Sequence, residues 1–262
     1  TMMEAWAPVL DIIKGQISNK VAALASDEPD GRGWYLSFAP YMKGKGYEVY
    51  KADQEFGLVP LETTDFTPLI KEWTAAGCDT LWVNSPGVFF GTFWRQARTL
   101  GFKPKIVFAS RAGLFYTDVK AWGVDLPQAV CNEKFWVPDI GGAVGIGDTT
   151  PKSFDERWKK ATGQPTNPIL GFGYADIQVL IDAIERAGSI DGEKVNAALA
   201  KTDMPTMWGR IQFDDEHFSR VPCFFGQWQK SDKPWVWDNP IVISQLPEVP
   251  VTGKLIFPIP YE

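Results

Sequence analysis

Polar residues follow several apolar segments of the chain and could together bind a small solute. Asp30, Ser85 and Arg111 each come after a run that is typical of a buried strand. In open parallel sheets, ligands bind outside the carboxyl ends of the strands. We therefore expect the binding residues in four segments, which are 30–34, 85–90, 110–112 and 135–136.

The residue types that carry most enzyme chemistry are scarce. His217 is the single histidine, which excludes a two-histidine zinc site and a histidine relay. Cys78, Cys131 and Cys223 form no C-x-x-C motif and are expected to be small buried apolar residues. No P-loop, dinucleotide-binding or nucleophile-elbow motif occurs. The sequence predicts no catalytic residue, no metal site and no cofactor, although its many carboxylates keep an enzyme acting on a small acid as an alternative.

Composition predicts a folded, acidic protein. Of 262 residues, 45% are hydrophobic and 22% are charged, which is enough apolar surface for a core. The net charge is 26 − 32 = −6, and no Lys/Arg run reaches four residues, so nucleic acid is not an expected partner. No apolar run approaches the roughly 20 residues of a membrane span, and no signal peptide pattern is present.

The first two-fifths of the chain alternate between apolar runs and amphipathic segments. Strands are predicted at 21–25, 47–50, 80–83, 105–108 and 129–136, and helices at 33–43, 64–76 and 88–100. This alternation favours βαβ units and a parallel sheet. The strands lack period-2 alternation, which fits a sheet covered on both faces.

The pattern changes after Pro138. A Gly-rich connection over 139–151 precedes helices at 153–162, 169–187 and 193–201, and the first of these is expected to begin with a capping box of Ser153 and Glu156. Strands follow at 209–213, 223–229 and 235–244, and Asp214–Glu216 is expected to be the solvated turn of a hairpin between two of them. The proline-rich segment 246–262 is expected to be an extended tail on the surface.

Four motifs in order resemble one family. They are T-D-F-T-P-L-I at 64–70, W-R-Q-A-R-T-L-G-F at 94–102, the long run from Gly173 to Gly188, and G-R-I-Q-F-D at 209–214 followed by G-Q-W at 226–228. Together they resemble the branched-chain amino acid (leucine/isoleucine/valine) type of periplasmic solute-binding protein, the type I proteins of ABC importers. The resemblance covers about residues 2–244.

The resemblance implies an α/β fold with a Rossmann-like parallel sheet, but the family's N-terminal β/α units have no counterpart here. Residues 1–138 and 206–246 would form the C-terminal-lobe domain, 139–205 a crossover and helices returning to a largely missing lobe, and 247–262 the tail. The helices at 153–162 and 169–187 would then expose apolar surface, which a missing N-terminal segment or a partner chain would cover.

The resemblance also implies a function. The protein would be a non-enzymatic, periplasmic or extracytoplasmic component that binds an amino-acid-like or organic-acid solute between two lobes and presents it to a membrane permease. A sensory ligand-binding domain of the same fold stays open as an alternative.

Family members place ligand contacts in loops that correspond to the segments singled out above. Asp30 and Trp34 fall in the first loop, where Trp34 either stacks on a ligand or packs beneath its helix. Backbone N–H groups at the Ser85-Pro86-Gly87 turn can bind a carboxylate, or Ser85 can simply cap the helix with Pro86 as its first residue. Of Phe89 and Phe90, one is expected to face the cleft and the other the core.

Arg111 replaces the glutamate that amino acid binders of the family often place here to meet the ligand ammonium. Arginine carries a fixed positive charge and a planar fork of donors. We therefore expect the solute to present a carboxylate to Arg111, and we expect the protein to prefer an organic acid over leucine, isoleucine or valine. Trp136 and Phe172 could line an aromatic ligand's pocket or pack in the core.

Overall fold

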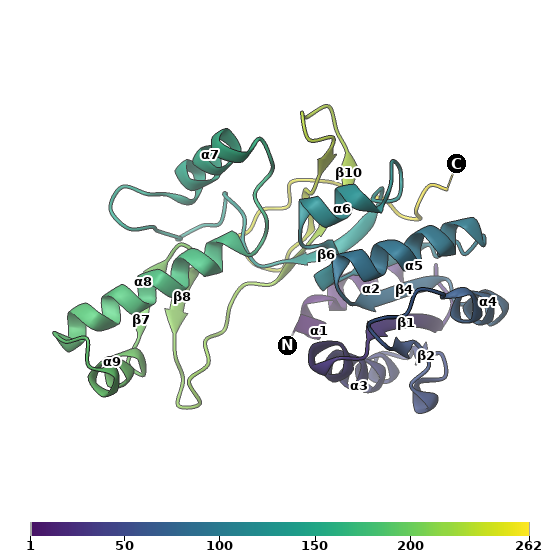
Figure 1. Ribbon diagram of the computed structural model, residues 1–262, viewed down its shortest axis with the longest axis horizontal. Helices are drawn as coiled ribbons and strands as arrows, with labels where there is room; N and C mark the ends of the chain where they lie inside the picture. The colour runs from purple at the N-terminus through teal and green to yellow at the C-terminus, as the bar shows by residue number, and fades with distance from the viewer. Residues whose placement is uncertain (1, 262) are drawn as a thin grey trace. The chain divides into compact units, whose positions relative to one another are not determined.

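The computed structural model describes residues 2–261, and the chain divides into two compact units (Figure 1). The first unit contains the chain up to Glu133, then Phe225–Ile243, and the chain from Val251 onward. The second contains Lys134–Phe224 and Ser244–Pro250. Residues 206–224, which we expected with the sheet, therefore group with the helices of the second unit.

An eight-stranded sheet forms the centre of the first unit, in the order β12-β9-β6-β5-β4-β1-β2 with β3 also paired to β1. Strands β2, β1, β4, β5 and β6 are paired in parallel, as is β3 with β1, whereas β12 is antiparallel to β9. The parallel α/β prediction is confirmed. The strands are β1 (Lys20–Ser26), β2 (Glu48–Val49), β3 (Leu58–Val59), β4 (Thr80–Asn84), β5 (Ile106–Ala109), β6 (Val130–Lys134), β9 (Phe224–Gln227) and β12 (Ile241–Ile243).

Helices cover both faces of this sheet. Side chains of β1 alternate between two cores, with Leu24 in one and Ala23 in the other, because successive residues of a strand point to opposite faces. The first core contains helices α4 (Thr67–Ala75), α5 (Gly87–Thr99) and α6 (Tyr116–Trp122). The second contains α2 (Ala7–Ile13) and α3 (Pro29–Gly44), and α1 (Met2–Ala5) precedes them. Two short 3₁₀ turns lie at Ala52–Gln54 and Arg111–Gly113.

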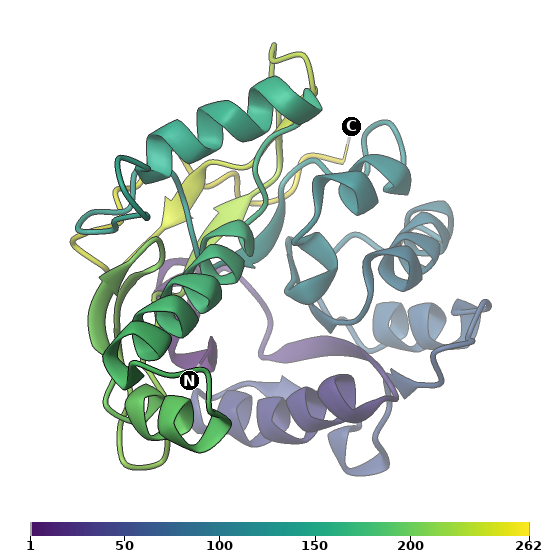
Figure 2. The same ribbon diagram turned by 60° about the vertical axis from the view of Figure 1, so that its left-hand side comes forward.

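The second unit consists mainly of helices α7 (Pro151–Thr162), α8 (Leu170–Ala187) and α9 (Gly192–Leu199), with α9 beside one end of α8 (Figure 2). Helix α8 ends at Gly188, whose φ of 57° suits glycine, as predicted. The second unit also contains an antiparallel hairpin of β7 (Asp203–Thr206) and β8 (Gly209–Gln212). The buried Gln178 links α8 to this hairpin by accepting from the Met207 N–H at 2.7 Å.

The predicted pairing of the last strands is wrong. Strand β8 pairs with the preceding β7, and β9 pairs with β12, so Asp214–Glu216 turns no hairpin between them. The segments 223–229 and 235–244 each contain two short strands, which adds β10 (Gln229–Lys230) and β11 (Trp237–Asp238). Pro240 lacks the N–H that a continuous strand would need.

Two further corrections concern caps and the tail. Helix α7 is capped by Thr150, with Pro151 first and Ser153 completing the capping box, rather than by Ser153 and Glu156. The proline-rich tail is not confined to the surface: the side chain of Ile259 is buried, and its N–H donates to the Lys105 carbonyl at 2.9 Å. Across residues 2–261, no helix combines the length and the apolar character that a membrane crossing requires.

Candidate functional site

Four buried polar residues stand where neighbouring strands of the first unit end. Ser26 closes β1, Asn84 closes β4, Ser110 follows β5, and Glu133 lies near the end of β6. Each is at most 4% exposed. The register pairs Ala25 with Asn84 and Phe108 with Cys131, so these positions meet at one edge of the sheet.

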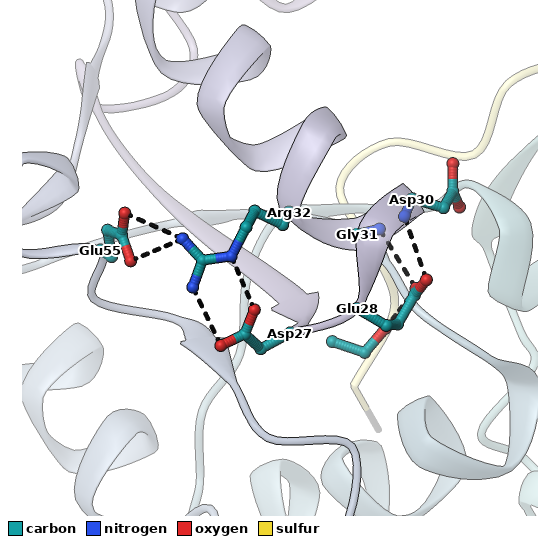
Figure 3. Close-up of polar contacts among 7 residues, drawn as sticks. Asp27, Glu28, Asp30, Gly31, Arg32 and Glu55 are labelled. Atoms are coloured by element: carbon teal, nitrogen blue, oxygen red, sulfur yellow. Dashed lines mark hydrogen bonds and ion pairs between the residues drawn. The ribbon is translucent and has the colours of Figure 1, made fainter.

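Glu28 shapes the entrance of helix α3 at this edge. Its side chain accepts from the backbone N–H groups of Asp30 at 3.0 Å and Gly31 at 3.1 Å, so it serves as the N-cap (Figure 3). The Ser26 hydroxyl donates to the same carboxylate at 3.1 Å. Burial raises the pKa of Glu28, but hydrogen bonds from Arg111, Asp30 and Ser26 lower it more, and the pKa falls below its usual range. Glu28 is therefore an ionised, fixed group.

Gly31 allows the close approach that this cap requires. A Cβ atom at Gly31 would lie 2.0 Å from the Ser26 carbonyl oxygen, which is far inside van der Waals contact. Only glycine therefore lets the first turn of α3 lie against the end of β1.

Arg111 lies at the centre of the edge. Its Nη2 donates to Glu28 at 2.7 Å and to the Ser26 hydroxyl at 3.3 Å, and its Nη1 lies 2.8 Å from Asp30 Oδ2. Asn84 Nδ2 donates to the same Asp30 oxygen at 3.4 Å. The guanidinium thus joins residues more than 80 positions earlier in the chain, and two carboxylates share its charge. We name Ser26, Glu28, Asp30, Asn84, Arg111 and Glu133 the Arg111 cluster.

The cluster contains buried atoms whose hydrogen-bonding capacity is unused. Asn84 Oδ1, Arg111 Nε and Glu133 Oε2 are inaccessible and have no hydrogen-bond partner among the described residues. Such groups carry a desolvation cost in a folded protein. Desolvation raises the pKa of Glu133 to about 7; Ser110 and Arg111 oppose the rise, and Asp30 adds to it. The described part of the chain therefore satisfies the hydrogen-bonding groups of this polar edge only in part.

A second arginine lies on the outer side of the same helix start. Arg32 binds Asp27 through Nε at 2.8 Å and Nη2 at 3.0 Å, and its Nη1 reaches both Glu55 oxygens at 3.2 Å (Figure 3). Its side chain is 42% exposed. The hydrogen bond from Arg32 lowers the pKa of Asp27 and raises that of Arg32. We name these three residues the Arg32 cluster.

Comparison with known proteins adds to this geometry. Residues 4–233 match the family model described as periplasmic binding protein. The chain belongs to this family. It is 22% identical over 236 residues to the Leu/Ile/Val-binding protein homolog 7 of Brucella abortus, an alignment that covers 87% of this chain and 57% of the relative. The chain thus spans little more than half the length of the curated relatives it matches.

Two solved structures share the periplasmic binding protein fold with this chain. A leucine binding protein from Thermotoga maritima superposes with a TM-score of 0.69 at 20% identity, covering 93% of this chain and 66% of that one. A solute binding protein of an ABC transporter from Rhodopseudomonas palustris, in complex with 3,4-dihydroxybenzoic acid, gives 0.68 at 20% identity, covering 95% and 66%. The family is extracytoplasmic and binds solutes.

The structure brings Asp30 and Arg111 together at the sheet edge, as the sequence suggested. Asp30 lies within the first turn of α3 and not in a preceding loop, because the helix begins at Pro29. Arg111 is already paired with two carboxylates, which sequence reasoning did not foresee.

The Ser85-Pro86-Gly87 turn is arranged differently from the prediction. Pro86, not Ser85, is the N-cap of α5, and Ser85 is fully buried. A Cβ at Gly87 would meet the Asp118 carboxylate at 2.5 Å, so an internal carboxylate already stands beside this helix start. Burial raises the pKa of Asp118 above its usual range.

The aromatic candidates of the first unit lie in its cores. Phe89 and Phe90 are both buried, so the expectation that one of them faces a cleft is wrong, and Phe89 packs edge-on against Phe66. Trp34 is 5% exposed and stacks on Phe38 at 4.6 Å between ring centroids.

Two aromatic candidates belong to the second unit. Trp136 is 1% exposed, donates to the Met207 carbonyl at 3.0 Å, and lies so close to Gly171 that a Cβ there would be 2.0 Å away. It is therefore a packing residue. Phe172 is half-buried, contacts Trp208, and lines an apolar cavity of about 510 Å³ with Phe154 and Tyr174.

Four members of the cluster were not among the predicted site residues: Ser26, Glu28, Asn84 and Glu133. Asn84 ends a strand next to a segment that we singled out, so its position was an available signal. Glu133 lies inside the strand predicted at 129–136, where the pattern gave no sign of a functional side chain. Among residues 2–261 no group of three or more His, Cys, Asp or Glu is placed to hold a metal ion.

Proposed function

We propose that this protein binds a small amino-acid-like or organic-acid solute through the Arg111 cluster, as the solute-binding component of an ABC importer. The observation that carries the proposal is the position of Arg111 at the carboxyl edge of a parallel sheet, beside buried polar atoms that have no hydrogen-bond partner among residues 2–261. Arginine recognises a carboxylate through parallel N–H donors. The solute would present its carboxylate to Arg111.

The names of structural neighbours support both solute classes. One neighbour is a leucine binding protein, and another was solved with 3,4-dihydroxybenzoic acid. Because Arg111 offers donors where an ammonium would need acceptors, we favour an organic acid over leucine. We also propose that binding occurs without turnover and that a membrane permease receives the solute.

The test is calorimetry on the intact protein with 4-hydroxybenzoate, benzoate, leucine, isoleucine and valine. We expect saturable binding of the aromatic acids and weaker binding of the three amino acids. Tight leucine binding that is unchanged in Arg111→Ala would contradict the proposal. Mass spectrometry of each solute after incubation should show no new product.

We further propose that a family-type N-terminal segment, or a partner chain that supplies it, covers helix α8. Ile177, Leu180 and Ile181 are 55%, 41% and 40% exposed on this helix. Monomers rarely leave contiguous apolar surface of this kind uncovered. Hydrogen exchange should show slow exchange of α8 amides in the intact protein and faster exchange in a protein consisting of these 262 residues alone; equal exchange would contradict this assignment.

A further inference from the structure

Asp30 differs from the other carboxylate that binds Arg111. Glu28 is 25% exposed and is fixed by two backbone N–H groups, a hydroxyl and the guanidinium. Asp30 is 55% exposed, and its side-chain contacts among the described residues are both made by Oδ2, to Arg111 at 2.8 Å and to Asn84 at 3.4 Å. An exposed ion pair of this kind contributes little stability. Asp30 can therefore leave at small cost, whereas Glu28 cannot.

The two groups that hold Asp30 are suited to a solute carboxylate. Arg111 Nη1 and Asn84 Nδ2 converge on one oxygen of Asp30. Any carboxylate placed there would accept a charge-assisted hydrogen bond from Arg111 and a hydrogen bond from the Asn84 side-chain amide. An external carboxylate and Asp30 would compete for the same donors. With Glu28 fixed nearby, both could not remain without like-charge repulsion.

We propose that Asp30 occupies the place of the solute carboxylate and sets how tightly this site binds acids. The inference rests on the proposed function, since it assumes that Arg111 receives a carboxylate. Solute binding displaces the Asp30 side chain into solvent, while Glu28 keeps its hydrogen bond from Arg111 Nη2. Asp30 thus discriminates against weakly bound acids, and removing its charge opens the site to them.

The experiment measures the affinity of the intact protein for benzoate and for benzamide, which has a similar shape but no charge. Asp30→Asn and Asp30→Ala should bind benzoate up to about fivefold more tightly than the unchanged protein, the range expected when one exposed ion pair is removed. Benzamide should gain less than benzoate in both variants, because it competes for the same donors but carries no charge for Asp30 or Glu28 to repel. Asp27→Asn is the matched control, because it removes a carboxylate from the same segment, but one that pairs with Arg32.

The outcomes separate this inference from the proposed function. Unchanged or weaker benzoate binding by both Asp30 variants overturns the role of Asp30 alone, when the unchanged protein binds benzoate and Arg111→Ala does not. An equal gain in Asp27→Asn also overturns it, since the effect would then be general charge. Failure of the unchanged protein and of both Asp30 variants to bind benzoate overturns the proposed carboxylate recognition and this inference together.

Discussion

The Arg111 and Arg32 clusters both consist of ion pairs between an arginine and two carboxylates, but they differ in burial and in how fully their polar atoms are hydrogen-bonded. In each cluster, one arginine lies between two carboxylates. The neighbouring residues Asp27 and Glu28 form ion pairs with different arginines, Asp27 with Arg32 and Glu28 with Arg111. The Arg32 cluster is exposed and satisfied by its own members. The Arg111 cluster joins residues far apart in the sequence and borders buried polar atoms without partners among the described residues. The Arg111 cluster is therefore the one that we propose as a binding site, because its buried polar atoms, and not its ion pairs, set it apart from the Arg32 cluster.

The largest expected contrast is between Arg111→Ala and Arg32→Ala. Loss of Arg111 removes the carboxylate partner, and truncating one member of a desolvated charge pair costs about 2–5 kcal/mol of binding free energy. Arg32→Ala leaves the sheet edge intact and should leave affinity unchanged. Calorimetry with 4-hydroxybenzoate measures both. A similar loss in the two variants would remove the distinction between the clusters.

Glu133 gives a pH dependence of stability opposite in sign to that of Asp27 in the Arg32 cluster, because the pKa of Glu133 is raised and that of Asp27 is lowered. Its pKa of about 7 in the folded protein lies above its ordinary 4.5, so the folded state binds this proton more tightly than the unfolded state. The resulting stability is complete below about pH 4.5 and is lost as the pH rises through 7. It amounts to a free energy of unfolding on the order of 3 kcal/mol.

Urea unfolding from pH 4.5 to 8 measures this term. The unchanged protein should lose stability across the window relative to Glu133→Gln, which has no such proton. Parallel curves for the two proteins would show that Glu133 titrates normally and that the edge is better solvated than the structure indicates.

The two neighbouring carboxylates should also differ in their effect on stability. Glu28→Ala removes the N-cap of α3 and should cost about 0.5–2 kcal/mol of unfolding free energy. Asp27→Ala removes only exposed contacts to Arg32 and should hardly move the thermal midpoint. Thermal unfolding at pH 7 compares the two variants, and an equal or larger loss in Asp27→Ala would reverse the assignment of the structural role.

The sequence predicted the parallel sheet, and it placed two members of the Arg111 cluster at the carboxyl edge of that sheet. Apolar runs such as Val21–Ala25 gave the parallel strands, and the rule for ligands at carboxyl ends selected Asp30 and Arg111. Glu28 was missed because glutamate is not among the favoured N-caps. Glu133 was missed because a single carboxylate in an apolar strand does not reveal that it is buried. The pairing of β8 was missed because sequence alone does not say which neighbour a short strand will choose.

The most direct test of the account is the NMR response of the arginine Nε–H groups to benzoate in the intact protein. Signals of Arg111 and Arg32 are assigned by Arg111→Lys and Arg32→Lys. We expect benzoate to shift the Arg111 signal along a saturating curve and to leave the Arg32 signal in place, because only the Arg111 cluster offers donors to a solute carboxylate. Equal, unsaturated shifts of both signals, or a saturating shift of Arg32 alone, would contradict the account.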